Sequence, residues 1–149
     1  MAFLREVLMK IRRKGANEMS IEETLAAYRL LLHVRKDLVE SFYNIAERRL
    51  REVYDDFSMT MLKLDKTIQT LRRILENEAK ISIDESKTFS IDENIQKLSL
   101  ETSLAFRSLL QNAKLLKEFS QSMPHQYLRA ILRGVDDAID KVIKILGGF

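Results

Sequence analysis

The chain has 149 residues, of which 46% are hydrophobic and 32% charged, a balance that indicates a globular protein and not a disordered one. Only four glycines and one proline occur, so a loop-rich or all-β fold is disfavoured. Cysteine is absent, which excludes disulfides and thiolate metal sites and fits a reducing compartment. We therefore expect one helical domain with a substantial core.

No apolar run approaches the roughly 18–20 residues that a membrane span needs. Arg5, Glu6 and Lys10 interrupt the first apolar stretch, and no small-residue cleavage site follows, so a signal peptide is not expected. The sequence thus predicts a cytoplasmic protein, with peripheral contact to a membrane left open.

Residues 2–14 predict a short amphipathic helix, the N-terminal segment. One face is apolar, with Phe3, Leu4, Val7, Leu8 and Ile11. The basic residues are Arg5, Lys10, Arg12, Arg13 and Lys14. Against Glu6 they give this segment +4 (five minus one), so the other residues sum to −1 within the net +3. These ten residues are candidate contacts for an anionic membrane surface or an acidic partner, and packing on the bundle is the alternative.

Residues 20–80 lack both Gly and Pro. Ser20 and Glu23 form a capping-box pattern that predicts a helix start. Apolar residues then follow at steps of mostly three and four: Leu25, Tyr28, Leu32, Val39, Phe42, Ala46, Leu50, Val53, Phe57, Met61, Leu64, Ile68, Leu71 and Leu75. We expect one very long helix over about 21–80, ~90 Å in length. Residues 55–58 are the candidate position for a bend, and two shorter helices separated there are the alternative.

Residues 81–90 predict a linker rich in turn-forming residues, and Ser90 predicts the next helix start. Helices are then expected over about 91–122 and 126–146, separated at Pro124. Asn112 interrupts the apolar stripe of the first. It either enters the seam or lies at its edge with Ala113 inward. The predicted fold is therefore an all-α antiparallel helical bundle or hairpin, with residues 20–146 as its single domain.

Catalytic or metal-binding patterns are not evident. His33 and His125 are far apart in the sequence, and a zinc site needs three or four ligands. Three adjacent acidic pairs begin at Asp55, Asp92 and Asp136. Neighbouring helical residues diverge by about 100°, so these pairs do not converge on one substrate. Phosphate-binding glycine loops and nucleophile motifs are also missing. The sequence predicts a non-enzymatic protein without cofactor or metal.

Arg48, Arg49 and Arg51 are the candidate nucleic-acid contacts, as in a small subunit of a larger ribonucleoprotein or DNA complex. Glu47 and Glu52 flank them at helical spacing, so a salt-bridged face is the favoured interpretation. Phosphate binding needs several uncompensated cations on one face.

The helix lengths lead to the functional prediction. Helices of ~48 Å (91–122) and ~32 Å (126–146) cannot cover one of ~90 Å, which leaves large apolar side chains exposed. We therefore expect a scaffold or adaptor that self-associates, or binds a helical protein partner, through coiled-coil-like helices. Nucleic-acid binding is the alternative.

Overall fold

The computed structural model describes residues 19–83 and 89–147. Its elements are the helices α2 (Ile21–Glu47), α3 (Arg51–Arg73), the π-helical turn η1 (Ile74–Glu78), α4 (Ile91–Gln96), α5 (Leu100–Phe119) and α6 (His125–Leu146). No strand occurs in these residues, so the prediction of an all-α bundle is confirmed. The predicted helix over 2–14 lies outside the described residues.

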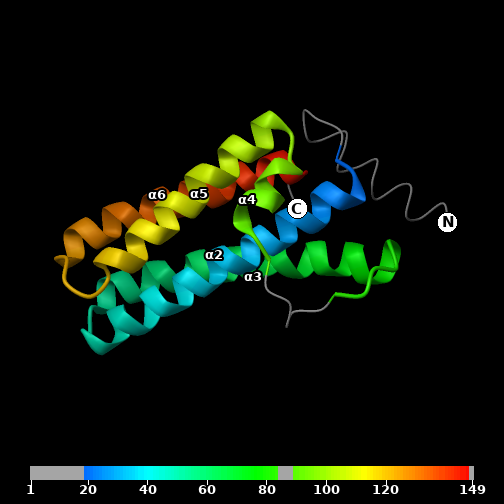
Figure 1. Cartoon of the computed structure of the whole chain (residues 1–149). Helices are drawn as coiled ribbons and strands as arrows, with labels where there is room; N and C mark the ends of the chain where they lie inside the picture. The colour runs from blue at the N-terminus through cyan, green and yellow to red at the C-terminus, as the bar shows by residue number, and fades with distance from the viewer. Residues whose placement is uncertain (1–18, 84–88, 148–149) are drawn as a thin grey trace.

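The four long helices form two antiparallel hairpins, α2 with α3 and α5 with α6, which lie side by side (Figure 1). Asn44 near the end of α2 donates to the Ser120 hydroxyl after α5, at 2.9 Å. At the starts of α6 and α3, His125 lies 3.6 Å from Glu52. Each helix of one hairpin therefore runs parallel to its neighbour in the other, and both hairpin turns lie at the same end.

Capping explains where the first helix begins. The Ser20 hydroxyl accepts from the Glu23 amide at 3.0 Å, as the sequence predicts. Ser90 caps α4 in the same way through the Glu93 amide, at 3.3 Å. A side-chain oxygen at each position satisfies one of the amides that have no partner inside the helix.

The predicted continuous helix over 21–80 is wrong, because the chain reverses at residues 48–50. Arg49 takes a left-handed conformation with φ 57°. Its amide donates to Ala46 at 3.0 Å and the Leu50 amide to Ile45 at 3.4 Å, which is the hydrogen-bond pattern of a Schellman motif. Glycine usually occupies this position, so an arginine here left no sequence signal. The predicted bend at 55–58 lies inside α3 and is also wrong.

This reversal folds α3 back on α2 and covers most of the apolar stripe within the chain. Val53, Phe57, Leu64, Ile68 and Leu71 of α3 are all buried, as predicted. The chain therefore needs no second copy to cover this part of the stripe. Self-association itself stays a prediction.

The predicted helix over 91–122 is also two helices. α4 ends at Gln96, and α5 begins after Ser99, whose hydroxyl accepts from the Thr102 amide at 3.4 Å. The Ser99 cap therefore starts a new helix at a place where the apolar spacing predicts one continuous helix. Within α5, Asn112 is half-buried and donates to the Ser108 carbonyl, while Ala113 is fully buried, so the edge position is confirmed.

The connection between the hairpins crosses the other end of the bundle. α3 and α5 lie on a diagonal, since each packs against α2 and α6 but not against the other. Lys80, two residues after the end of η1, takes the left-handed conformation, and the Ile81 amide donates to the Leu75 carbonyl at 2.7 Å. α4 then packs against α2 and α5 (Figure 1).

Replacing Arg49 with glycine is expected to raise the free energy of unfolding by about 1 kcal/mol, since a left-handed non-glycine residue is strained by 1–2 kcal/mol. Urea unfolding measures the change. Arg51→Gly, at the first helical position of α3, is the matched control and is expected to lower stability. Equal losses in both variants would contradict the role assigned to this turn.

Candidate functional site

The outer side of the α2–α3 hairpin carries a groove of about 570 Å³, which we call the hairpin groove. It is lined by the apolar side chains Val39, Phe42, Tyr43, Met61 and Leu62 and by the polar side chains Arg35, Ser58 and Asp65. All of these residues come from α2 and α3, so the groove exists only because the chain reverses between them.

The walls of the hairpin groove are apolar and accessible. Tyr43 is 66% exposed and Leu62 is 51% exposed. The Phe42 ring lies 4.7 Å from that of Tyr54 and 5.3 Å, edge-on, from that of Phe57. Such aromatic pairs add about 0.5–1.5 kcal/mol beyond area burial. These ring contacts hold the Phe42 side chain in place in the groove.

An ion pair borders the hairpin groove. The Arg35 Nε donates to Asp65 Oδ1 at 2.8 Å, from α2 to α3. Both side chains are well exposed, so the pair adds little stability. Its position gives a partner one cation and one anion to recognise at the edge of an apolar surface.

A second hollow, of about 310 Å³, lies on the other side of α3, between α3 and α6. Met59, which is 68% exposed, borders it together with Leu132, Arg129 and Arg133. Met59 and Leu62 are three residues apart, so α3 presents them as an exposed ridge between the two hollows.

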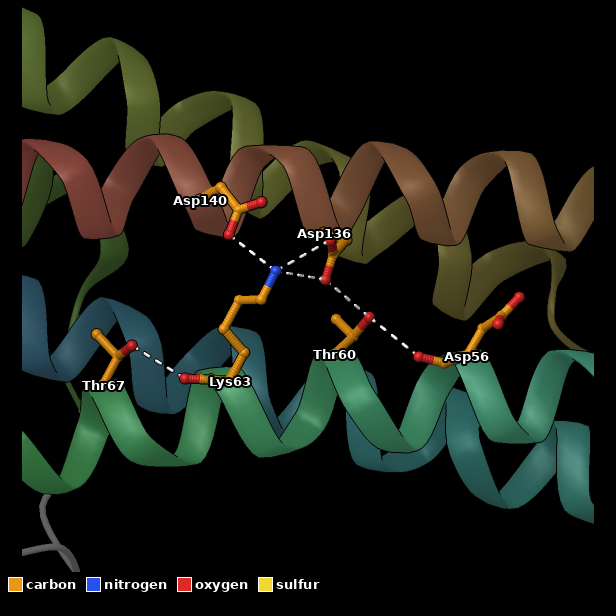
Figure 2. A network of polar contacts seen from close by, with 6 residues as sticks. All are labelled: Asp56, Thr60, Lys63, Thr67, Asp136 and Asp140. Atoms are coloured by element: carbon orange, nitrogen blue, oxygen red, sulfur yellow. Dashed lines mark hydrogen bonds and ion pairs between the residues drawn. The ribbon is translucent and has the colours of Figure 1, made fainter. Parts of the chain in front are cut away.

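A polar network joins α3 to α6 (Figure 2). The Lys63 ammonium lies 3.1 Å from both Asp136 oxygens and 2.8 Å from Asp140 Oδ1, and the Thr60 hydroxyl reaches Asp136 at 3.0 Å. Burial alone would lower the pKa of Lys63, but its hydrogen bonds to Asp140 and Asp136 and their negative charges outweigh burial and raise that pKa.

Asp136 and Asp140 also belong, with Asp137, to a cluster of acidic side chains close enough together to hold a metal ion. Asp136, Asp137 and Asp140 offer oxygens within 4.8 Å of one another. The Lys63 ammonium already supplies a positive charge to two of them, so the network is explained as a link between hairpins. Helical spacing could not predict the contact of Lys63 with Asp136, because the two residues lie 73 positions apart in the sequence.

A second cross-link joins α2 to α5. Asp37 is only 5% exposed, and Lys117 approaches its Oδ1 at 3.3 Å. Hydrogen bonding to Asp37 and the charge of that carboxylate raise the pKa of Lys117. His33, four residues earlier on α2, lies 3.7 Å from the other Asp37 oxygen. The buried carboxylate thus has cationic or polar neighbours on both sides.

The hairpin turn separates the three candidate nucleic-acid contacts. Arg48 donates to the Ser120 carbonyl at 3.0 Å and so links the two hairpins. Arg49 and Arg51 are exposed and line a hollow of about 420 Å³ with Tyr54 and Asp55. The predicted i,i+4 geometry of Glu47 with Arg51 and of Arg48 with Glu52 is lost because the helix ends between them.

Glu52 instead lies 3.7 Å from Arg129 of α6, in addition to its contact with His125. The predicted salt-bridged face is therefore replaced by contacts between the hairpins. All ten candidate contacts in the N-terminal segment, from Phe3 to Lys14, lie outside the described residues.

Sequence reasoning missed the hairpin groove. Val39, Phe42 and Met61 fit the apolar stripe, which predicts that they are buried in the core, but they are only partly buried. Tyr43 and Leu62 fall off the stripe. The available signal was the presence of large apolar residues directly beside stripe positions on both helices.

Comparison with known proteins gives no relative: no family model, no curated protein and no solved structure matches the chain. In the part of the chain that the structure describes, no helix is both long enough and apolar enough to cross a membrane.

The Lys63 network predicts a specific pH dependence. Because the folded-state pKa of Lys63 is raised above 10.5, its stabilising contribution is complete below that pH and is lost as the pH rises through the raised value. The difference in unfolding free energy between wild type and Lys63→Met is therefore expected to be constant from neutral pH to about 10.5 and to shrink above it. Urea titrations at each pH measure it.

Lys66→Met is the control, since Lys66 is exposed on the same helix. It is expected to change stability little at any pH. A Lys63 difference that persists unchanged in strong alkali would contradict the assignment.

Proposed function

We propose that the protein is a non-enzymatic adaptor that binds a helical protein partner through the hairpin groove. The observation that carries this proposal is the exposure of Tyr43 from α2 and Leu62 from α3 along one mainly apolar groove. Clustered exposed apolar side chains of this kind mark interaction surfaces in soluble proteins.

A groove between two antiparallel helices suits a third helix. Side chains of an amphipathic helix at positions i, i+3, i+4 and i+7 fill such a groove, while the polar face of that helix stays in water. Tyrosine and methionine are enriched in protein interfaces, and Tyr43 and Met61 line the groove, while Met59 borders the neighbouring hollow between α3 and α6. The Arg35–Asp65 pair at the edge would select the register of the bound helix.

The other proposed contacts rest on the sequence. The basic residues of the N-terminal segment are proposed to contact an anionic membrane surface or an acidic partner, and the protein is proposed to act in the cytoplasm. A second copy is one candidate helical partner for the groove. Nucleic-acid binding has less support, because Arg48 is bonded to Ser120 and Asp55 lies beside Arg49 and Arg51.

Replacing Leu62 with aspartate is expected to abolish partner binding, because the charge would sit within the apolar groove. Affinity capture from the native cytoplasm, quantified by mass spectrometry, compares Leu62→Asp with wild type. Leu104→Asp is the matched control: Leu104 is 58% exposed but lies on α5, away from the groove.

Proteins captured by wild type and by Leu104→Asp, but lost with Leu62→Asp, support the proposal. Identical captures by all three forms would sink it. Sedimentation of the same variants over a range of concentrations shows whether the captured partner is a second copy.

A further inference from the structure

We propose that in the free protein the hairpin groove is occupied by the chain's own N-terminal segment, residues 2–14, which an external partner or an anionic surface must displace. This inference rests on the proposed function, because it names what regulates access to the same groove.

The apolar face of the N-terminal segment and the hairpin groove are both apolar surfaces that are more stable when removed from water. The apolar face formed by Phe3, Leu4, Val7, Leu8 and Ile11 has the periodicity of a helix, but a 13-residue helix alone is marginal in water, since helices below ~12–15 residues need tertiary contacts. The hairpin groove is an apolar surface of complementary kind, with five large side chains along its walls. Burying one against the other removes both from water.

The length of chain before α2 matches the position of the groove. Along α2, the groove extends from Arg35 to Tyr43, which is ~21 to ~33 Å beyond Ile21 at 1.5 Å per residue. The six steps along the chain from Lys14 to Ser20 span up to ~20 Å when extended, at 3.3–3.6 Å per residue. A helix over 2–14 adds ~20 Å more. A segment that leaves Ser20 and returns along the bundle therefore covers the full extent of the groove.

The direction of the chain also fits. A helix formed by residues 2–14 would run antiparallel to α2 and parallel to α3, so it would add a third member to the hairpin. The tether is short, so the effective concentration of the segment at the groove is on the order of millimolar, and weak contacts suffice to keep it there.

Docking and membrane contact require the same apolar face. An amphipathic helix on an anionic membrane buries its apolar side chains and holds its basic residues near the headgroups. In the groove those apolar side chains are hidden, while Lys10, Arg12, Arg13 and Lys14 stay in water. The groove and an anionic surface therefore compete for the segment, and binding of a partner in the groove releases it.

A single tryptophan placed in the segment tests the proposal in the full chain, which has no native tryptophan. In Phe3→Trp, the indole emission is expected at shorter wavelength than in the denatured chain and protected from iodide quenching. Adding Leu62→Asp is expected to abolish most of both effects, and Tyr43→Ser to reduce them. Adding Leu104→Asp is expected to change neither. Circular dichroism confirms that each variant is folded.

Vesicles of phosphatidylserine and phosphatidylcholine supply an independent measurement. The Leu62→Asp variant is expected to bind them more tightly than Leu104→Asp, because its segment is no longer held. Equal vesicle binding would overturn the competition.

The other occupants give distinct outcomes. Emission typical of exposed indole in the parent variant overturns docking. Emission typical of buried indole that neither Leu62→Asp nor Tyr43→Ser changes places the segment elsewhere on the bundle, and this result also overturns docking in the groove. A blue shift lost on dilution assigns the groove to the segment of a second copy and overturns docking within one chain. Partner capture that depends on Leu62 would survive any of these results, so the proposed function and this inference fail separately.

Discussion

The reversal of the chain at Arg48, Arg49 and Leu50 is the constraint on which the bundle depends. Two backbone hydrogen bonds close the end of α2, and the left-handed Arg49 redirects the chain so that α3 returns along it. Arg48 and Asn44 then bond to Ser120, which fixes the second hairpin beside the first. A straight helix in this region would have neither a covered seam nor a groove.

Charged contacts set the register between the hairpins. Lys63 lies between Asp136 and Asp140, and Lys117 lies against the nearly buried Asp37. Apolar helix faces can slide by a turn with little loss of burial, whereas a buried carboxylate that loses its cation is strongly destabilised. The contact of Lys117 with the nearly buried Asp37 therefore favours one relative height of the two hairpins, and the more exposed Lys63 contacts fit the same height.

Local rules predicted the helical class, the caps at Ser20 and Ser90 and the buried face of α3. These features depend on residues within a few positions of one another, and a single sequence contains them. The reversal at Arg49 was missed because its cost is met by backbone hydrogen bonds and by packing, not by a glycine. The cap at Ser99 was hidden by apolar spacing that continues through it.

The site was less predictable than the fold. Whether Val39, Phe42 and Met61 lie in the core or at the edge of a groove depends on which helices surround α2, and that is a property of the tertiary arrangement. The partners of Lys63 and Lys117 lie 73 to 80 residues away, beyond the reach of helical periodicity.

The parallel arrangement of the two hairpins has a consequence for the order in which the protein assembles. Each hairpin closes over a turn of a few residues, so its contacts are local and fast to form. Every ion pair between α3 and α6 or between α2 and α5 must instead wait for the closure of the connection that crosses the bundle from η1 through α4. Docking of the two hairpins is therefore expected to follow their formation. Until it is complete, the inward faces of both hairpins are open to water, and the α2–α3 hairpin already carries its outward groove.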